Sequence, residues 1–250
     1  MKEENKMEIR IFENKEALSR AAAKYFIDVL QEKKHPVLGL ATGSSPEGMY
    51  LKLIEAYQDG KIDFKNVKTY NLDEYVGLEK SHPQSYYSFM QEHLFKHVNI
   101  EADNINLPNG LGDPEENCVA YNRLLNENEI DIQVLGIGSN GHIAFNEPGT
   151  SFSSVTHCVE LDKNTLKDNA RFFDNDISKV PTQALTMGLS NIMKAKQIIL
   201  IATGTNKAEA VRHMIQGDVS ENMPASILQF HPNVVILTDR EAAKAFVKQD

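Results

Sequence analysis

The chain has 250 residues, 41% of them hydrophobic and 24% charged, which is ordinary for a soluble globular protein and permits one large domain with its own core. Its formal net charge of −9 excludes a general basic surface for nucleic acid. The two cysteines have no zinc-type spacing, the charged N-terminus lacks a signal-peptide core, and no apolar run reaches membrane-spanning length, so we expect a cytoplasmic protein without membrane or nucleic-acid partners.

Short apolar runs alternate with helical patterns along the chain. Apolar residues recur at helical spacing over 15–33, and the run at 37–41 (VLGLA) predicts a buried strand. The next segment predicts a helix capped by Ser45, with Pro46 in its first position and Gly60 at its end. Further strands are expected at 67–72, 132–138, 197–202 and 233–239, with a helix at 205–217 and one more plausible strand at 155–161.

This alternation is typical of an α/β domain with a largely parallel sheet. Connections in such a sheet are right-handed, so every loop that follows a strand lies at the same edge, where ligands bind. Four polar stretches are therefore expected to converge there: 41–46 (ATGSSP), 71–75 (NLDEY), 136–142 (GIGSNGH) and 202–207 (ATGTNK).

Residues 136–141 fit G-x-G-x-x-G, the dinucleotide fingerprint, and Glu160 lies at about the expected distance downstream. That fingerprint needs a helix whose N-terminus faces the pyrophosphate. Here Pro148 and Gly149 break any helix after about two turns, too early for a crossover helix. The sequence therefore argues against a nicotinamide or flavin enzyme.

The glycines instead allow sharp turns that present Asn140 and His142 at the end of a strand. Glu147 lies five residues after His142, near enough to meet the imidazole across a tight turn. A histidine held between an amide and a carboxylate is a tunable general acid/base. For either residue alone, an ordinary loop histidine or a carboxylate before a proline is the alternative; their concentration in one loop favours a functional interpretation.

Two of the loops carry groups that attract phosphate. Thr42, Ser44 and Ser45 supply hydroxyls at a helix N-terminus, where backbone N–H groups and the helix dipole favour an anion. Lys207 begins the next helix, where an acid would be usual, so an anionic partner is expected for it. Arg171 is a second candidate cation.

The stretch NLDEY carries Asp73 and Glu74 directly after a buried strand. Two adjacent acids at the ligand-binding edge indicate a base for proton abstraction or a metal ligand; solvated loop carboxylates are the alternative. The metal interpretation is weaker, because no second carboxylate or histidine cluster has the usual spacing. Adjacent side chains point apart, so at most one of the two is expected to face the site. Together the loops suit acid/base chemistry on a small phosphorylated metabolite.

The segments NLDEYVGL, SHPQSYYSFM, LGIGSNGHIAFNEPGT and ARFFDND resemble the glucosamine-6-phosphate deaminase family, also called glucosamine-6-phosphate isomerase. The resemblance extends from about LGLATGSSP to ATGTNKA. It implies a Rossmann-like, doubly wound, mostly parallel sheet with helices on both faces, in a single domain spanning 1–250. It also implies conversion of glucosamine 6-phosphate and water to fructose 6-phosphate and ammonium, as part of amino-sugar catabolism, without a metal or redox cofactor.

The resemblance also implies roles for individual residues. Asp73 would move a proton from C2 toward C1 during enolisation, and His142 would open the pyranose ring, with Glu147 and Asn140 orienting and tuning it. The phosphate would be held by Gly43, Ser44, Ser45, Arg171 and Lys207. A separate hypothesis, drawn from the residues themselves, is that the polar segment 161–181 around Arg171 forms a lid that closes when phosphate binds.

Two departures from the family pattern matter. Many members have Asp where this chain has Asn140, which adds no negative charge and should stabilise an imidazolium less. Members activated by N-acetylglucosamine 6-phosphate carry basic residues in the strand after the signature and a longer tail. Here His157, Val159 and Glu160 occupy those places and the chain ends at Asp250. We therefore expect neither activation by that ligand nor the hexamer associated with it. Either a monomer or another homo-oligomer is compatible with the sequence.

Two other functions compete with this interpretation. A 6-phosphogluconolactonase hydrolyses an ester and needs no enolisation base, so the DEY and HIAFNEP motifs favour a deaminase. A non-catalytic sugar-phosphate sensor would need a DNA-binding helix-turn-helix, for which the segment before the first expected strand at 37 is too short.

Overall fold

The computed structural model describes residues 7–161, 166–167, 170 and 173–247. Its main sheet is built from β1 (Glu8–Phe12), β2 (Val37–Leu40), β3 (Lys68–Asn71), β5 (Ile105–Asn106), β6 (Ile132–Leu135), β9 (Ile198–Ala202) and β10 (Val234–Asp239). These strands lie in the order β1-β10-β9-β6-β2-β3-β5, and every neighbouring pair is parallel. The predicted parallel α/β sheet is confirmed.

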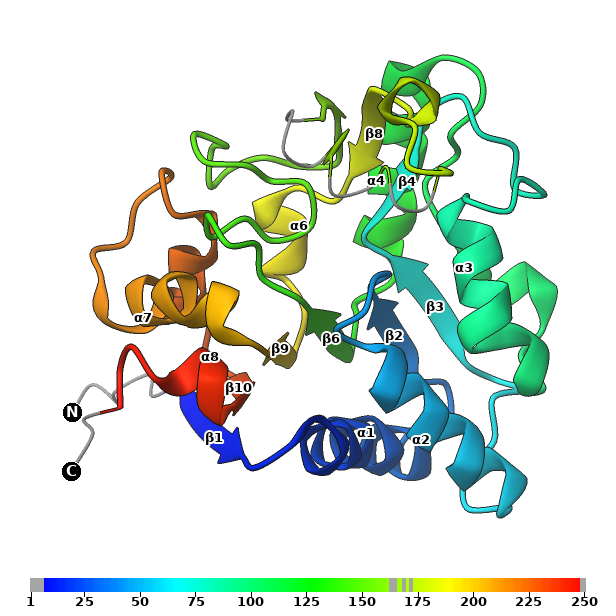
Figure 1. The fold of residues 1–250 in the computed structure, drawn as a ribbon. Coiled ribbons are helices and arrows are strands. Elements are labelled where there is room, and N and C mark those ends of the chain that lie inside the picture. Colours follow the sequence, from blue (N-terminus) through cyan, green and yellow to red (C-terminus); the bar gives the residue numbers. More distant parts are fainter. Residues whose placement is uncertain (1–6, 162–165, 168–169, 171–172, 248–250) are drawn as a thin grey trace.

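The helices surround this sheet (Figure 1). They are α1 (Lys15–Glu32), α2 (Glu47–Gln58), α3 (Tyr86–His93), α4 (Pro114–Glu127), α6 (Leu189–Ile192), α7 (Ala208–Gln216) and α8 (Arg240–Ala243). The packed pair α1 and α2 lies on one side of the strands, and α6 lies on the other. In α1, Leu18, Ala22, Phe26 and Leu30 are buried at intervals of four residues, which is why the apolar spacing predicted this helix.

The centre of the core is formed by strands that are buried on both faces. All residues of β6 and β9 are buried, as are the first five of β10. Strands of this kind read as continuous apolar runs, because helices cover both sides of a parallel sheet. The same property made these three strands recognisable in the sequence.

The strand order reverses between β2 and β6. From β2 the chain proceeds to β3 and β5 on one side, and afterwards to β6, β9 and β10 on the other. Such a reversal leaves a crevice outside the carboxyl ends of the two strands, where α/β proteins bind their ligands.

A second, smaller sheet lies beyond that edge (Figure 1). It contains β4 (Asp73–Tyr75), β8 (Gln183–Thr186) and β7 (His157–Glu160), paired antiparallel in the order β4-β8-β7. Its apolar side belongs to a separate small core that includes Tyr75, Phe145, Phe173 and Ala184. Because β4 follows β3 after a single residue, this sheet holds Asp73 directly above the main sheet.

Two expectations about local structure were wrong. Helix α2 begins at Glu47, one residue later than expected, and Ser45 does not cap it. Pro46 occupies the N-cap position, with its carbonyl accepting the bond from Tyr50 N at 3.0 Å. The first strand is β1, not the run at 37; among its five residues the majority are exposed, so it carries no continuous apolar run.

Among the residues that the structure describes, none of the helices combines the length and the apolar character that crossing a membrane requires.

Candidate active site

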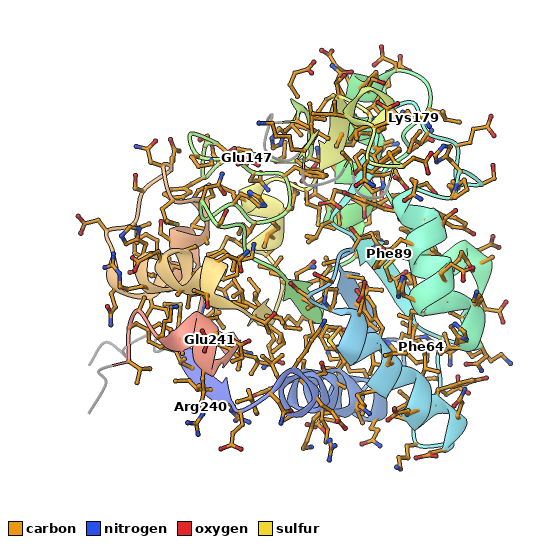
Figure 2. All side chains as sticks on the ribbon, viewed as in Figure 1. Phe64, Phe89, Glu147, Lys179, Arg240 and Glu241 are labelled. Atoms are coloured by element: carbon orange, nitrogen blue, oxygen red, sulfur yellow. The ribbon has the colours of Figure 1, made fainter. Side chains whose placement is uncertain are left out.

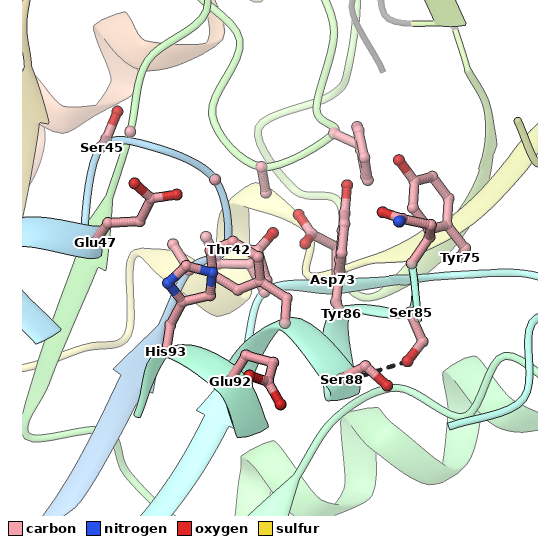
Figure 3. A pocket seen from close by; sticks show the side chains of 18 of the residues that line it. Thr42, Ser45, Glu47, Asp73, Tyr75, Ser85, Tyr86, Ser88, Glu92 and His93 are labelled. Atoms are coloured by element: carbon pink, nitrogen blue, oxygen red, sulfur yellow. Dashed lines mark hydrogen bonds between the residues drawn. The ribbon is translucent and has the colours of Figure 1, made fainter. Parts of the chain in front are cut away.

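A pocket of about 420 Å³ lies at the carboxyl ends of β2, β3 and β6, where the strand order reverses (Figure 3). Its volume is in the range of small-molecule sites. Three of the four predicted loops line it, through Ala41–Gly43 and Ser45, through Leu72, Asp73 and Tyr75, and through Gly136–Gly138 and His142. The fourth loop, 202–207, follows β9 at the same edge but contributes none of the lining residues.

The loop after β2 is fixed by a buried tyrosine. The Tyr50 hydroxyl donates to the Ala41 carbonyl at 2.6 Å and accepts from the Ala41 N–H at 3.2 Å. Gly43 then has a φ of +89°, a conformation that favours glycine, and the chain turns so that Ser45 faces the pocket. Ser44 lies outside the lining; its carbonyl accepts a hydrogen bond from Lys15 Nζ at 3.1 Å.

The two adjacent acids have different environments, as the sequence predicted. Asp73 lines the pocket and is only 7% exposed. Burial, reinforced by the charge of Glu74, raises the pKa of Asp73 from 3.8 to about 8. An aspartate with such a pKa exchanges a proton readily near neutral pH, which is what a general base requires.

Glu74 points away from the pocket and has a structural role. Its carboxylate accepts backbone hydrogen bonds from Tyr75, Tyr86 and Tyr87 at 2.9–3.0 Å. Burial raises the pKa of Glu74, and these three N–H groups counteract part of that effect. Since Tyr86 and Tyr87 begin α3, Glu74 anchors the N-terminus of that helix, where a negative charge is favourable.

His142, Asn140 and Glu147 form one polar cluster in the loop after β6, where Figure 2 labels Glu147. Glu147 Oε1 lies 3.1 Å from His142 Nδ1, and its Oε2 accepts from the Asn140 amide at 2.6 Å. The Asn140 Oδ1 in turn accepts from the His142 backbone N–H at 3.2 Å. At this distance Nδ1 and Oε1 are in direct contact, but their geometry is not that of a hydrogen bond.

Two glycines of this loop have structural roles, one beside the His142 ring and one in the turn before it. A Cβ on Gly138 would lie 2.4 Å from the His142 ring, so the ring packs directly on that glycine. Gly141 has a φ of +87°, and a Cβ there would lie 1.9 Å from Met223 Sδ. Residues 142–150 contain no helix, so the loop lacks the N-terminus that a pyrophosphate needs. The expectation that no crossover helix follows Gly141 is confirmed.

The remaining candidates lie outside the pocket lining or outside the described residues. Lys207 ends the single turn of 3-10 helix Thr205–Lys207 that leads into α7. Asn140 and Glu147 stand behind His142 and do not line the pocket themselves. Arg171 falls outside the described residues, as do 162–165, 168–169 and 172 of the predicted lid at 161–181. In the described ranges, no group of three or more His, Cys, Asp and Glu is arranged to hold a metal ion.

Sequence reasoning missed one wall of the pocket, which is formed by α3 and the residues before it (Figure 3). Tyr86 contacts Tyr75 at a ring-centroid distance of 4.7 Å and stacks on Phe145 at 6.2 Å. Phe89, labelled on α3 in Figure 2, stacks on His93 at 4.1 Å, and both line the pocket. A signal for the start of this helix was present in SHPQSYYSFM, because Ser85 is its N-cap and accepts from Ser88 N.

Several known proteins are similar to this chain in sequence and in fold. Residues 13–236 match the family described as glucosamine-6-phosphate isomerases/6-phosphogluconolactonase. The glucosamine-6-phosphate deaminase of Oceanobacillus iheyensis is 52% identical over 94% of this chain and 95% of its own, and that of Clostridium novyi is 50% identical over 95% and 99%. A solved structure of a monomeric glucosamine-6-phosphate deaminase is 46% identical and superposes with a TM-score of 0.93, covering 96% of this chain and all of that one. The chain therefore belongs to the glucosamine-6-phosphate isomerase and 6-phosphogluconolactonase family and, within it, to the glucosamine-6-phosphate deaminases.

Proposed function

We propose that this chain converts glucosamine 6-phosphate and water to fructose 6-phosphate and ammonium, as a cytoplasmic enzyme of amino-sugar catabolism. One observation carries the proposal: the buried Asp73 carboxylate and His142 line the same pocket as Gly43 and Ser45 of the loop after β2. A base, an acid/base and a phosphate loop are the three elements that the reaction requires. Nearly full-length identity of about half to deaminases supports it.

The phosphate group binds first in this proposal. Gly43 gives the ligand access to the backbone and Ser45 supplies a hydroxyl. Positive charge is assigned to Lys207, which lies outside the pocket lining, and to Arg171. Residues 161–181 close over the bound sugar and exclude water. Anchoring the phosphate fixes the position of C1 and C2 relative to the catalytic groups, which converts their reaction into an effectively intramolecular one.

Ring opening is then assigned to His142. The pyranose opens when the proton on O1 leaves and a proton reaches the ring oxygen, and a single imidazole can transfer it. Glu147 lies 3.1 Å from Nδ1 and orients the ring, while Asn140 holds the second carboxylate oxygen of Glu147. Gly138 supports the other side of the imidazole.

Asp73 carries out the isomerisation. Its ionised carboxylate takes the proton from C2 while O1 takes up a proton from solvent, leaving an enolamine, and the resulting carboxylic acid delivers its proton to C1. The product is an iminium at C2, which water attacks so that ammonia leaves and the ketone forms. The raised pKa of Asp73, about 8, suits a group that must both accept and return a proton.

An ammonia-release assay on glucosamine 6-phosphate tests the proposal. Asp73→Asn should lower kcat by about 10²- to 10⁴-fold, the usual contribution of a general base. The 6-phosphogluconolactonase alternative predicts hydrolysis of 6-phosphogluconolactone without release of ammonia, and activity that survives Asp73→Asn. Binding without turnover of any phosphorylated sugar would support a non-catalytic sensor instead.

A further inference from the structure

The pocket has an unusual charge balance for a site that holds a phosphate. Glu47, Asp73 and Glu92 line it, and the described lining residues include neither lysine nor arginine. As far as the described residues go, a dianionic phosphate therefore depends on positive charge that lies outside this lining. The whole chain, with a net charge of −9, provides no favourable background field.

Lys15 is in direct contact with the phosphate loop, which we define as residues 41–46. It is the first residue of α1, and its Nζ donates to the Ser44 carbonyl at 3.1 Å. The helix end that carries it is fixed, because the Asn14 side chain accepts from Ala17 N at 2.9 Å. Ser44 is flanked by two residues that line the pocket, Gly43 and Ser45.

The packing of α1 against α2 keeps Lys15 and the loop together. The two helices approach so closely that a Cβ on Gly48 of α2 would lie 2.2 Å from the Ser19 Oγ of α1. The Tyr50 hydroxyl holds the start of the loop at Ala41 from the interior. Lys15 holds its middle from the outer side, so the loop is fixed at two points, one of which is charged.

The direction of the peptide group links this contact to the ligand. The peptide bond between Ser44 and Ser45 is trans, so the Ser45 N–H points opposite to the Ser44 carbonyl. An ammonium that holds the carbonyl toward α1 therefore turns the N–H of the next residue away from α1. That N–H belongs to a residue whose side chain already lines the pocket.

We propose that Lys15 is a positioning residue for substrate phosphate: it holds the Ser44 carbonyl away from the ligand, directs the Ser45 N–H toward it, and places a positive charge behind the phosphate loop. The inference rests on the proposed function for the identity of the substrate. It differs from that function in predicting an effect on binding alone, because Lys15 touches no group that moves a proton.

Three variants test it. Lys15→Met removes both donor and charge, Lys15→Arg keeps both, and Lys24→Met is the control. Lys24 lies on the same helix, is 74% exposed and pairs with Asp28 instead of the loop, so its replacement changes the net charge equally. Lys15→Met should raise KM for glucosamine 6-phosphate about 3- to 10-fold, as expected for one partly screened charge. Its kcat should stay within about twofold of the original, the pattern of lost uniform binding.

Salt and inorganic phosphate provide two further measurements. The dependence of KM on ionic strength should weaken in Lys15→Met, and Lys15→Arg should restore KM to within about twofold. Inorganic phosphate should raise the Tm of the original protein and of Lys24→Met more than that of Lys15→Met, each compared with its own phosphate-free Tm. Equal KM values and equal phosphate-dependent Tm shifts in Lys15→Met and Lys24→Met would overturn the proposal, as would a fall in kcat with KM unchanged.

The phosphate-dependent Tm shift separates the two claims. It needs no turnover, so it tests Lys15 even if the original protein releases no ammonia. Absence of ammonia release from the original protein would contradict the proposed function alone.

Discussion

Replacing Asp73 by asparagine should stabilise the folded protein while it lowers the rate of turnover. Burial raises the pKa of Asp73 from 3.8 to about 8, so between these pH values the folded protein retains a proton that the unfolded chain has released. The unfolded state binds fewer protons in this window, and stability therefore falls as the pH rises from about 4 to about 8. Asparagine has nearly the same shape and never ionises, so the variant avoids this loss.

The magnitude follows from the width of the window. The interval from the ordinary aspartate pKa of 3.8 to pH 7 is about 3 pH units, and each unit corresponds to about 1.4 kcal/mol. At pH 7 the free energy of unfolding of Asp73→Asn should therefore exceed that of the original protein by up to about 4 kcal/mol. At pH 5 the same arithmetic gives about 1.6 kcal/mol. Above pH 8 the carboxylate is ionised in both states, and the difference becomes constant.

Urea unfolding of the two proteins at pH 5, 7 and 8, followed by circular dichroism, measures this difference. Glu74→Gln is the matched control, because it is the adjacent buried acid but accepts three backbone N–H bonds. Its amide cannot satisfy all three, so we expect a loss of about 1–3 kcal/mol. An Asp73→Asn protein that is less stable than the original at pH 7, or a gain that does not grow between pH 5 and pH 8, would refute the reasoning.

Four further predictions concern activity. Gly138→Ala should lower kcat by at least about 10²-fold, because its methyl group would displace the His142 ring. Gly136→Ala is the control and should retain most activity, because a Cβ at Gly136 would have its nearest contact at 3.5 Å. Similar kcat values for the two variants would contradict this prediction. Asn140→Asp should move the acidic limb of the pH–rate profile to higher pH, since it adds a negative charge near the imidazole; an unchanged or lower limb counts against it. In the original protein kcat/KM should rise as the pH increases through about 8, where Asp73 loses its proton, and a rate independent of pH there would argue for another base. Substrate saturation should stay hyperbolic and unaffected by N-acetylglucosamine 6-phosphate; sigmoidal curves that respond to it would show an activating site after all.

The parts of the fold that the sequence predicted share one property, which is a strong local pattern. The strands at 132–135, 198–202 and 234–239 are buried on both faces and therefore appear as unbroken apolar runs. The edge strand Glu8–Phe12 has a mostly exposed surface, and the strand Gln183–Thr186 ends in a buried threonine, so neither has such a run. Parallel topology alone then sufficed to bring Asp73 and His142 to one edge.

Contacts between distant segments could not be predicted in this way. Asp73 owes its burial to the antiparallel pairing of β4 with β8, in which it lies opposite Thr186, more than a hundred residues later. The wall formed by α3 depends on Glu74 anchoring Tyr86, which follows from that same sheet. The contact between Lys15 and Ser44 arises from the close packing of two helices, whose local patterns specify their buried faces but not their relative position.

Isotope transfer measures the role of Asp73 most directly. With glucosamine 6-phosphate deuterated at C2, NMR follows where the label goes. If Asp73 carries the proton from C2 to C1, the original protein should place part of the deuterium at C1 of fructose 6-phosphate and lose the rest to water, while Asp73→Asn should leave it at C2. Removal of the C2 label by Asp73→Asn at the rate of the original protein would contradict the account.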